Sequence, residues 1–384
     1  MNEKEIRKYY RQYLYRDPSE IDYKYIENRE QLISSLVDTE EHEKVNKVLK
    51  MISSFTLPGI KYICSIGSSG YAYAARSNIL TLLEMGFPIT VEVKGMQNVS
   101  MDPNEDEKIL YSLVNKKIDY KAVIHHYLPP NWEVEKGKIN FGFYVIESNI
   151  LPPNWNLKQM DYLFTPSVTN FQTFNLGFVF RTKIRTKVLS KIKGDKFMFY
   201  TIAEWSNRKS LEETITCFTE TFKDENVILY IKTNRSPDIE YDNVIIDKSI
   251  MSEKEILELH ARGDCYISLA KSEGTGIGAC VACKFNNQLI LSCIDGHMDY
   301  LANFHEVSTE FEEINMCDSF PEHGDCKEGK CKVFPWFVSG SKWRKPNLKE
   351  ASRRMMEVYK GERKHSILID ENNEIKNIIT SLIK

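Results

Sequence analysis

One short stretch combines residues that could bind a phosphate with a residue that could bind a sugar. The carboxylate of Glu273 comes shortly after an apolar run at 264–270, and three glycines follow, at positions 274, 276 and 278. The apolar run is typical of a buried parallel strand, and the residues ACVACKF predict a short helix. The start of such a helix favours a phosphate, because its backbone amides and its dipole are positive there. A carboxylate can accept hydrogen bonds from sugar hydroxyls, so the stretch indicates a nucleotide sugar.

The elements around this stretch form a strand–turn–helix–strand unit. After the helix, NQLILS predicts a second apolar strand and DGH predicts a turn. In such a unit the helix begins above the carboxyl end of the first strand, which is where open α/β sheets bind their ligands.

Strands and helices alternate on either side of this unit, which predicts an α/β fold with two doubly wound layers. A strongly basic run at 181–196 separates the layers. In the second layer, Ser252 and Glu255 predict a capping box at the start of a helix. The other expected strands lie at 61–67, 87–93, 121–129, 139–148 and 161–167 in the first layer and at 196–205, 226–233 and 242–247 in the second.

The predicted organisation has four parts. A helical segment at 1–55 precedes a Rossmann-like domain at 56–185, and a second Rossmann-like domain follows at 196–355. Helices at 356–384 end the chain and could cross back to the first domain.

The composition is that of an ordinary globular protein, with 384 residues, 42% hydrophobic and 27% charged. The net charge of −3 gives no overall attraction to nucleic acid or membrane. The charged N-terminus lacks the apolar core of a signal peptide, and no apolar stretch reaches the ~20 residues of a membrane span. Nine cysteines, an odd number, favour reduced thiols, so we expect a cytoplasmic protein.

Five stretches, in order, resemble a known family. SEGTGIGACVAC, with QLILS and GHMDYL after it, is similar to the donor-binding segment of retaining nucleotide-sugar glycosyltransferases of the GT-B fold (family 4). The resemblance covers about 61–360 and implies two Rossmann-like domains with a cleft between them. The other four stretches are GSSGYAYAARSNILTLLEMG, ESNILPPNW with DYLFTPSVTN, EWSNRKSLEETI and SKWRKPNLKEASRRM.

The resemblance implies a donor site in the second domain. Lys209, with Arg208 beside it, would neutralise the diphosphate, and Glu273 would bind hydroxyls of the donor sugar. Cations at a helix start oppose the helix dipole, which favours a functional role over a solvated helix start. The backbone amides that would flank the phosphates are those of Gly276, Ile277 and Gly278.

The first domain would contribute a glycine turn and a histidine. By resemblance, Ser69, Gly70 and Tyr71 would approach the donor phosphates or the acceptor, although a tight strand–helix connection explains the same residues. Either His125 or His126, at the carboxyl end of a predicted strand, would contact the transferred sugar, unless both are structural.

The sequence departs from the family pattern at two places. Val281 stands where the family has a second glutamate that holds the ribose, and Ala203 and Glu204 occupy the region of an upstream arginine. These departures leave open a non-catalytic homologue that binds a sugar nucleotide or acts as a partner subunit. Glu147, at the end of another predicted strand, would orient the cleft or the acceptor.

A separate group of residues has the spacing Cys-x5-His-x2-Cys-x4-Cys. Four such ligands suffice for tetrahedral zinc, but unliganded loop thiols are the interpretation that we favour. The residues are Cys317, His323, Cys326 and Cys331.

The predicted function is retaining transfer of a sugar from a nucleoside-diphosphate donor to a glycan or glycoconjugate. The resemblance implies front-face attack in which the departing phosphate takes the acceptor's proton, with no cofactor and no metal required. An alternative is transfer to hydroxymethylated DNA bases, in which the basic run 181–196 would meet phosphates. The near-neutral charge argues against that alternative.

Overall fold

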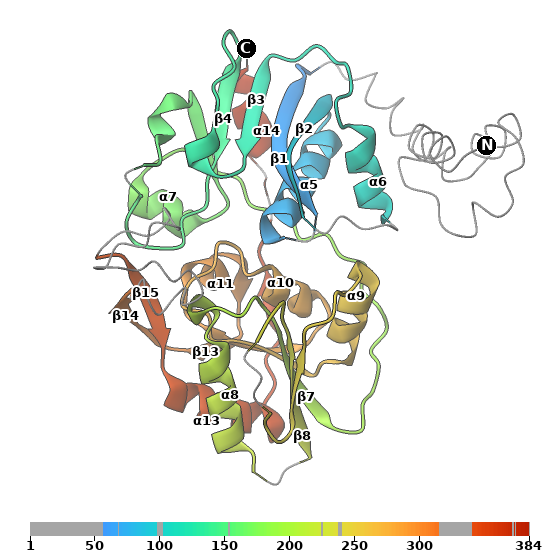
Figure 1. Ribbon diagram of the computed structural model, residues 1–384, viewed down its shortest axis with the longest axis vertical. Helices are drawn as coiled ribbons and strands as arrows, with labels where there is room; N and C mark the ends of the chain where they lie inside the picture. The colour runs from blue at the N-terminus through green and yellow to red at the C-terminus, as the bar shows by residue number, and fades with distance from the viewer. Residues whose placement is uncertain are drawn as a thin grey trace, which may run out of the picture. The chain divides into compact units, whose positions relative to one another are not determined.

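The computed structural model divides into two compact units, which we describe separately (Figure 1). Unit 1 comprises Met1–Tyr144, Leu157–Phe164 and Asn372–Lys384, and unit 2 comprises Val145–Asn156 and Thr165–Glu371. The domain bounds expected from the sequence stay a prediction. The helical segment expected at 1–55 and the Cys/His group lie outside the described residues, which are 57–67, 69–97, 103–152, 154–223, 226–236, 240–314, 340–370, 372 and 374–383.

The first sheet has six strands in the order β2-β1-β3-β4-β5-β6. The pairings from β2 to β5 are parallel. β3 is buried along its whole length, as expected of a parallel strand covered on two faces. The strands are β1 (Ile60–Gly67), β2 (Ile89–Gln97), β3 (Ala122–His126), β4 (Ile139–Phe143), β5 (Tyr162–Thr165) and β6 (Phe178–Val179). The helices of unit 1 are α5 (Gly70–Glu84), α6 (Glu105–Ser112) and α14 (Ile375–Leu382).

The strand predicted at 139–148 is too long. β4 ends at Phe143, and the amide of the buried Tyr144 donates one more hydrogen bond to Phe164 of β5, whereas the buried Ile146 lies beyond the sheet. The amide of Ile146 donates to Asn170 Oδ1 at 2.9 Å instead of to a neighbouring strand. An apolar run marks burial, and here the burial continues after the strand has ended.

The second sheet has the strand order β13-β11-β10-β7-β8-β9, with every pairing parallel. From β9 the strands run third, second, first, fourth, fifth and sixth along the chain, which is the doubly wound Rossmann order. The order reverses between β7 and β10. The strands are β7 (Phe197–Ile202), β8 (Val227–Lys232), β9 (Val244–Asp247), β10 (Cys265–Ser268), β11 (Gln288–Ser292) and β13 (His305–Val307).

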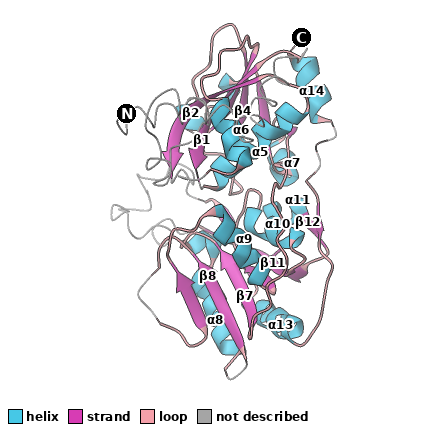
Figure 2. Ribbon diagram, turned by 90° about the vertical axis from the view of Figure 1, so that its right-hand side faces the viewer, coloured by secondary structure: helices cyan, strands magenta, loops and turns pink. Residues whose placement is uncertain are grey.

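Helices cover the second sheet, and Figure 2 shows them beside its strands. α9 begins with the predicted capping box of Ser252 and Glu255. The turn predicted at DGH is wrong, because these residues begin a short helix, α11. The helices of unit 2 are α7 (Val168–Phe174), α8 (Leu211–Thr221), α9 (Glu253–Arg262), α10 (Ile277–Lys284), α11 (Asp295–Tyr300) and α13 (Leu348–Tyr359).

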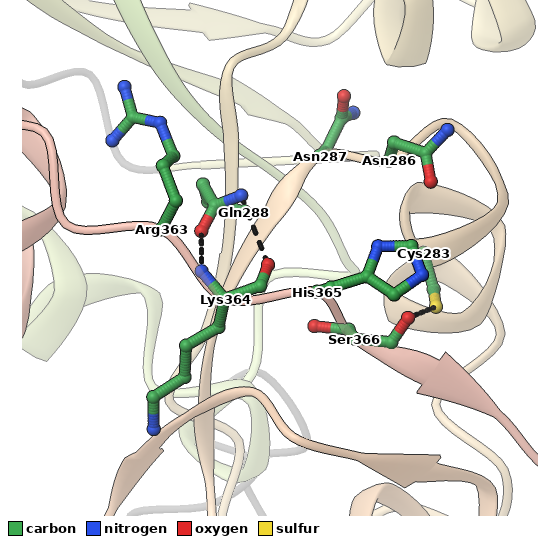
Figure 3. Close-up of a pocket in the computed structure, with 8 residues that line it drawn as sticks. All are labelled: Cys283, Asn286, Asn287, Gln288, Arg363, Lys364, His365 and Ser366. Atoms are coloured by element: carbon green, nitrogen blue, oxygen red, sulfur yellow. Dashed lines mark hydrogen bonds between the residues drawn. The ribbon is translucent and has the colours of Figure 1, made fainter.

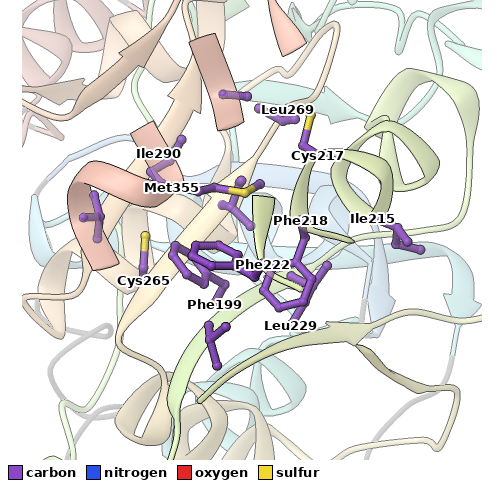
Figure 4. Close-up of a cluster of buried hydrophobic side chains, with 14 of the residues drawn as sticks. Phe199, Ile215, Cys217, Phe218, Phe222, Leu229, Cys265, Leu269, Ile290 and Met355 are labelled. Atoms are coloured by element: carbon purple, nitrogen blue, oxygen red, sulfur yellow. The ribbon is translucent and has the colours of Figure 1, made fainter. Parts of the chain in front are cut away.

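Aromatic and aliphatic side chains fill the space between the second sheet and the helices α8 and α13 (Figure 4). Phe199 of β7 packs against Phe218 and Phe222, with ring centroids 6.2 and 5.5 Å away. Met355 of α13 and Ile290 of β11 belong to the same buried cluster. This core fixes the carboxyl ends of β7, β10 and β11, and therefore the loops that follow them.

Two short antiparallel pairs and three 3-10 turns complete the described elements. The pairs are β12 (Leu301–Ala302) with β16 (Ile367–Leu368) and β14 (Thr309–Glu313) with β15 (Lys342–Pro346). The turns are η1 (Pro129–Asn131), η2 (Leu157–Gln159) and η3 (Asn207–Lys209). None of the helices in the described ranges has the length and apolar character needed to cross a membrane. The fold class is α/β with two Rossmann-like sheets, as predicted.

Candidate functional site

The predicted site residues of unit 2 follow the two strands at which the sheet order reverses. Arg208 and Lys209 lie in η3, after β7, and Glu273 lies in the loop after the neighbouring strand β10. The carboxyl ends of parallel strands meet at one edge of a sheet, and ligands of open α/β sheets bind where the strand order reverses. The topology therefore brings these three side chains to the position where a ligand is expected.

Lys209 and Glu273 form a direct ion pair in this structure. Lys209 Nζ lies 2.5 Å from Glu273 Oε1, and the two side chains are only 13% and 16% exposed. Burial raises the pKa of Glu273, but the charges of Lys209 and Arg208 outweigh burial, so this pKa lies below its ordinary value. Glu273 is therefore an ionised carboxylate at neutral pH.

Arg208 is held by two further carboxylates. Its Nη1 lies 2.8 Å from Glu147 Oε1 and donates to the carbonyl oxygen of Ser272 at 2.9 Å. Its Nη2 lies 2.9 Å from Glu204 Oε1. Burial lowers the pKa of Arg208, but Glu147, Glu273 and Glu204 outweigh it and raise that pKa. Glu204, in the region of the missing family arginine, is thus a partner of Arg208.

The turn that carries these cations is fixed by a buried lysine that the sequence reading missed. Lys271 donates through Nζ to Asn207 Oδ1 and through its amide to the carbonyl oxygen of Arg208, the latter at 2.8 Å. Its charge is balanced by Glu213, 3.2 Å away. Ser210 then adopts a left-handed conformation, with φ of 51°, and starts α8. The available signal was a lysine directly after the apolar run of β10.

His297 is a second residue that the sequence reading left without a role. It is buried, and its Nδ1 lies 3.0 Å from the carbonyl oxygen of Ser292, so Nδ1 carries the proton. Its Nε2 is a buried acceptor without a hydrogen-bond partner. Burial is the main reason that the pKa of His297 lies below its ordinary value, so the ring is neutral. His297 lies against the start of α10, because a Cβ on Gly276 would lie 2.7 Å from its Cδ2.

The glycines around Glu273 are explained by close packing. Gly276 has a φ of +70° and begins α10 without a side-chain cap. A Cβ on Gly278 would lie 2.3 Å from the hydroxyl of Tyr266, and one on Gly296 would lie 2.5 Å from the carbonyl oxygen of Glu273. The phosphate-binding role of the amides of 276–278 stays a prediction. Val281, in place of the second family glutamate, is a buried residue of α10.

The predicted site residues of unit 1 lie at the corresponding reversal of the first sheet, between β1 and β3. Ser69 is the N-cap of α5, and its Oγ accepts a hydrogen bond from the amide of Ala72 at 3.2 Å. Gly70 is exposed at the start of the same helix. The turn therefore performs the structural function expected of a strand–helix connection, and its ligand role stays a prediction.

The two candidate histidines differ in their surroundings. The ring nitrogens of His125 lie 3.1 Å from Asn140 Oδ1 and 3.4 Å from Tyr127 Oη. His126 contacts Tyr71 edge-on, with ring centroids 5.3 Å apart, and its Nε2 is buried without a hydrogen-bond partner. Burial lowers the pKa of His126 to about 3, which keeps its ring neutral. Of the two, His126 is the one beside the predicted glycine turn.

A pocket in unit 2 lies away from this site (Figure 3). It opens at the start of β11, whereas the predicted donor residues follow the carboxyl ends of the strands. Among the described residues no group of three or more histidine, cysteine or acidic side chains could hold a metal ion. The pocket is lined by Cys283, Asn286, Asn287, Gln288, Arg363, Lys364, His365 and Ser366.

No protein-family model and no curated protein matches the chain. The chain is similar to solved structures of GT-B glycosyltransferases. Pneumococcal GtfA, an O-GlcNAc transferase in complex with UDP and GlcNAc, is 9% identical with a TM-score of 0.45, over 63% of this chain and 85% of that one. WaaG, a glycosyltransferase of lipopolysaccharide biosynthesis, is 11% identical with a TM-score of 0.43, over 62% and 82%. TarM is 14% identical with a TM-score of 0.36, over 43% of this chain and 38% of its own.

Proposed function

We propose that this protein is a retaining glycosyltransferase that uses a nucleoside-diphosphate sugar and a glycan or glycoconjugate acceptor. The observation that carries the proposal is the group of Arg208, Lys209 and Glu273 where the order of the second sheet reverses. Two cations suit a diphosphate, and a carboxylate suits the hydroxyls of the attached sugar. The uncapped start of α10 lies in the same loop as Glu273 and adds backbone amides for the phosphates.

The proposed reaction needs charge stabilisation more than it needs a base. The bond between the anomeric carbon and the phosphate oxygen breaks, and its electron pair stays on the diphosphate. The acceptor oxygen forms the new bond on the same face, and its proton passes to the departing phosphate oxygen. Arg208 and Lys209 stabilise the growing negative charge, which is the contribution that a divalent cation makes in other enzymes.

The alternative acceptor, hydroxymethylated DNA, depends on the basic run 181–196 as a phosphate-binding surface. Within that run Arg181 donates to the carbonyl oxygen of Asp299, and Lys191 donates to Asn287 and to the carbonyl oxygen of Gly263. These two cations are engaged with other residues of unit 2, which argues against a phosphate-binding role for them. The glycan acceptor is therefore the one we propose.

Calorimetry with UDP-, GDP- and ADP-sugars, followed by a donor-hydrolysis assay, tests the proposal. We expect one nucleotide family to bind and its sugar to be released. Lys209→Ala should lower turnover by about 10²-fold or more, as removal of a transition-state charge partner does. Lys360→Ala, at an exposed lysine after α13, is the matched control and should behave as the wild type.

Two results would contradict this function. Binding of a sugar nucleotide without turnover in any acceptor mixture would indicate the non-catalytic homologue. Full activity in Glu273→Ala would show that the sugar binds elsewhere.

A further inference from the structure

The charged cluster at the candidate donor site already has an excess of carboxylates. Arg208 and Lys209 are paired with Glu147, Glu204 and Glu273, so two cations meet three carboxylates and the net charge is −1. If all of these ion pairs stayed in place, a diphosphate that entered the cluster would meet net repulsion at short range. At least one carboxylate must therefore leave its cation when the diphosphate binds.

Of the two carboxylates that hold Arg208, Glu204 is the more exposed, at 50%, and Glu147 is the one whose backbone is fixed by a side-chain hydrogen bond. The indole of Trp343 donates to the Glu147 carbonyl oxygen at 2.9 Å, and the amide of Lys342 donates to Asn149 at 2.6 Å. Val145 packs on the other side against Gly274, where a Cβ would lie 2.4 Å from its Cγ1. The Glu147 side chain itself is 28% exposed.

Arg208 also has a backbone partner, which a diphosphate would not displace by charge repulsion. Its Nη1 donates to the carbonyl oxygen of Ser272, next to Glu273. The guanidinium can therefore exchange Glu147 for a phosphate oxygen without leaving its place, and such exchange retains a charge-assisted hydrogen bond.

We propose that Glu147 is an exchangeable partner of Arg208: the diphosphate displaces its carboxylate, which then binds the hydroxyl of the incoming acceptor. The inference rests on the proposed function, because it needs a diphosphate at Arg208. A carboxylate released next to the reacting sugar accepts a hydrogen bond from a hydroxyl and orients its oxygen. Donor binding would then create the acceptor site, and Glu147 would couple the two substrates.

The test compares Glu147→Gln with the wild type, using the nucleoside diphosphate that the wild type binds and its sugar donor in water. Loss of the competing charge should tighten nucleoside-diphosphate binding about fivefold in calorimetry. Donor hydrolysis, in which water takes the acceptor's place, should fall at least tenfold, because the neutral amide orients water less well. Tighter binding together with slower turnover is not the result of a damaged fold.

Two further variants separate the competition of Glu147 with the diphosphate for Arg208 from its binding of the acceptor hydroxyl. Glu204→Gln also removes a carboxylate from Arg208, so it should tighten binding as well, and it should lower hydrolysis less than Glu147→Gln does. Glu240→Gln, at an exposed site, should change neither quantity.

Weaker binding in Glu147→Gln would overturn the inference and would show that Glu147 only positions Arg208. Tighter binding with unchanged hydrolysis would overturn its acceptor role. If the wild type binds no nucleoside diphosphate at all, the proposed function itself fails, so the two failures are distinguishable.

Discussion

At the scale of single residues, the buried Lys209–Glu273 ion pair makes the stability of the fold depend on charge. Two buried charges lose hydration on folding and depend on each other, so removal of one partner leaves an uncompensated charge. This pair lies where the sheet order reverses, which is where open α/β sheets bind ligands. Its proposed role in binding a ligand can therefore be tested separately from its role in stability.

We predict that Glu273→Gln lowers the free energy of unfolding by about 3 kcal/mol at pH 7. The pKa of Glu273 is lower in the folded protein than in the unfolded chain. Its contribution is therefore complete above the unfolded value of about 4.3 and is lost as the pH falls through the lower folded value. Urea unfolding from pH 7 down to pH 3 should show the difference between the wild type and the variant shrinking.

The control for this experiment is Glu240→Gln, which replaces an exposed glutamate and should stay within about 0.5 kcal/mol of the wild type at every pH. A difference between the wild type and Glu273→Gln that stayed constant down to pH 3 would show that packing, and not charge, is responsible.

At the scale of elements, close packing against β7 and β10 determines where the loop after β10 ends and where α10 begins. Tyr266 of β10 donates to the carbonyl oxygen of Ile202 in β7 at 3.2 Å, and its hydroxyl occupies the space where a side chain at position 278 would begin. Gly278 therefore allows α10 to start directly over the sheet edge. The position of the helix start depends on a tyrosine twelve positions earlier in the chain.

We predict that Gly278→Ala destabilises the protein by about 1–3 kcal/mol, although alanine is the better helix former by about 1 kcal/mol. The added methyl group collides with the Tyr266 hydroxyl. Combining it with Tyr266→Phe should recover part of the loss. Thermal unfolding measures both variants, with Gly194→Ala at an exposed site as the control. Equal stability of Gly278→Ala and the wild type would mean that α10 can shift freely.

The sequence allowed the order of elements to be predicted, because apolar runs alternate with amphipathic segments and end at glycine or polar turns. It also placed Lys209 and Glu273 after the right strands. It did not predict α11, because a six-residue helix containing Gly296 has little helical propensity and is held by close contact with Glu273. It also missed the pairing of Arg208 with Glu147, since 61 positions separate them and only the folded chain brings them together.

At the scale of the whole molecule, the end of the chain belongs to unit 1 although the residues before it belong to unit 2. α14 buries Ile375 and Ile379, while Lys376 on the same helix is exposed. The last described helix, α14, is therefore part of the core of unit 1, although it follows unit 2 in the sequence.

We predict that Ile379→Ala destabilises unit 1 by about 2–5 kcal/mol, as other buried isoleucine-to-alanine changes do. Hydrogen exchange should become faster in β1 and β3 and stay unchanged in β7 and β10. Lys376→Ala is the control on the same helix and should leave exchange unchanged in all four strands. Faster exchange in β7 and β10 alone would place the helix with the other unit.

The short segment Val145–Asn156 has a consequence for any attempt to recombine this protein with a relative. The chain leaves unit 1 after Tyr144, supplies Glu147 to unit 2 and returns to unit 1 at Leu157. The residues that make up unit 2 are therefore not continuous in the sequence. A chimera that replaced only 196–355 would place the relative's residue at position 208 beside Glu147 of this protein. Grafts intended to test the proposed donor site should therefore exchange the twelve-residue segment together with the later block.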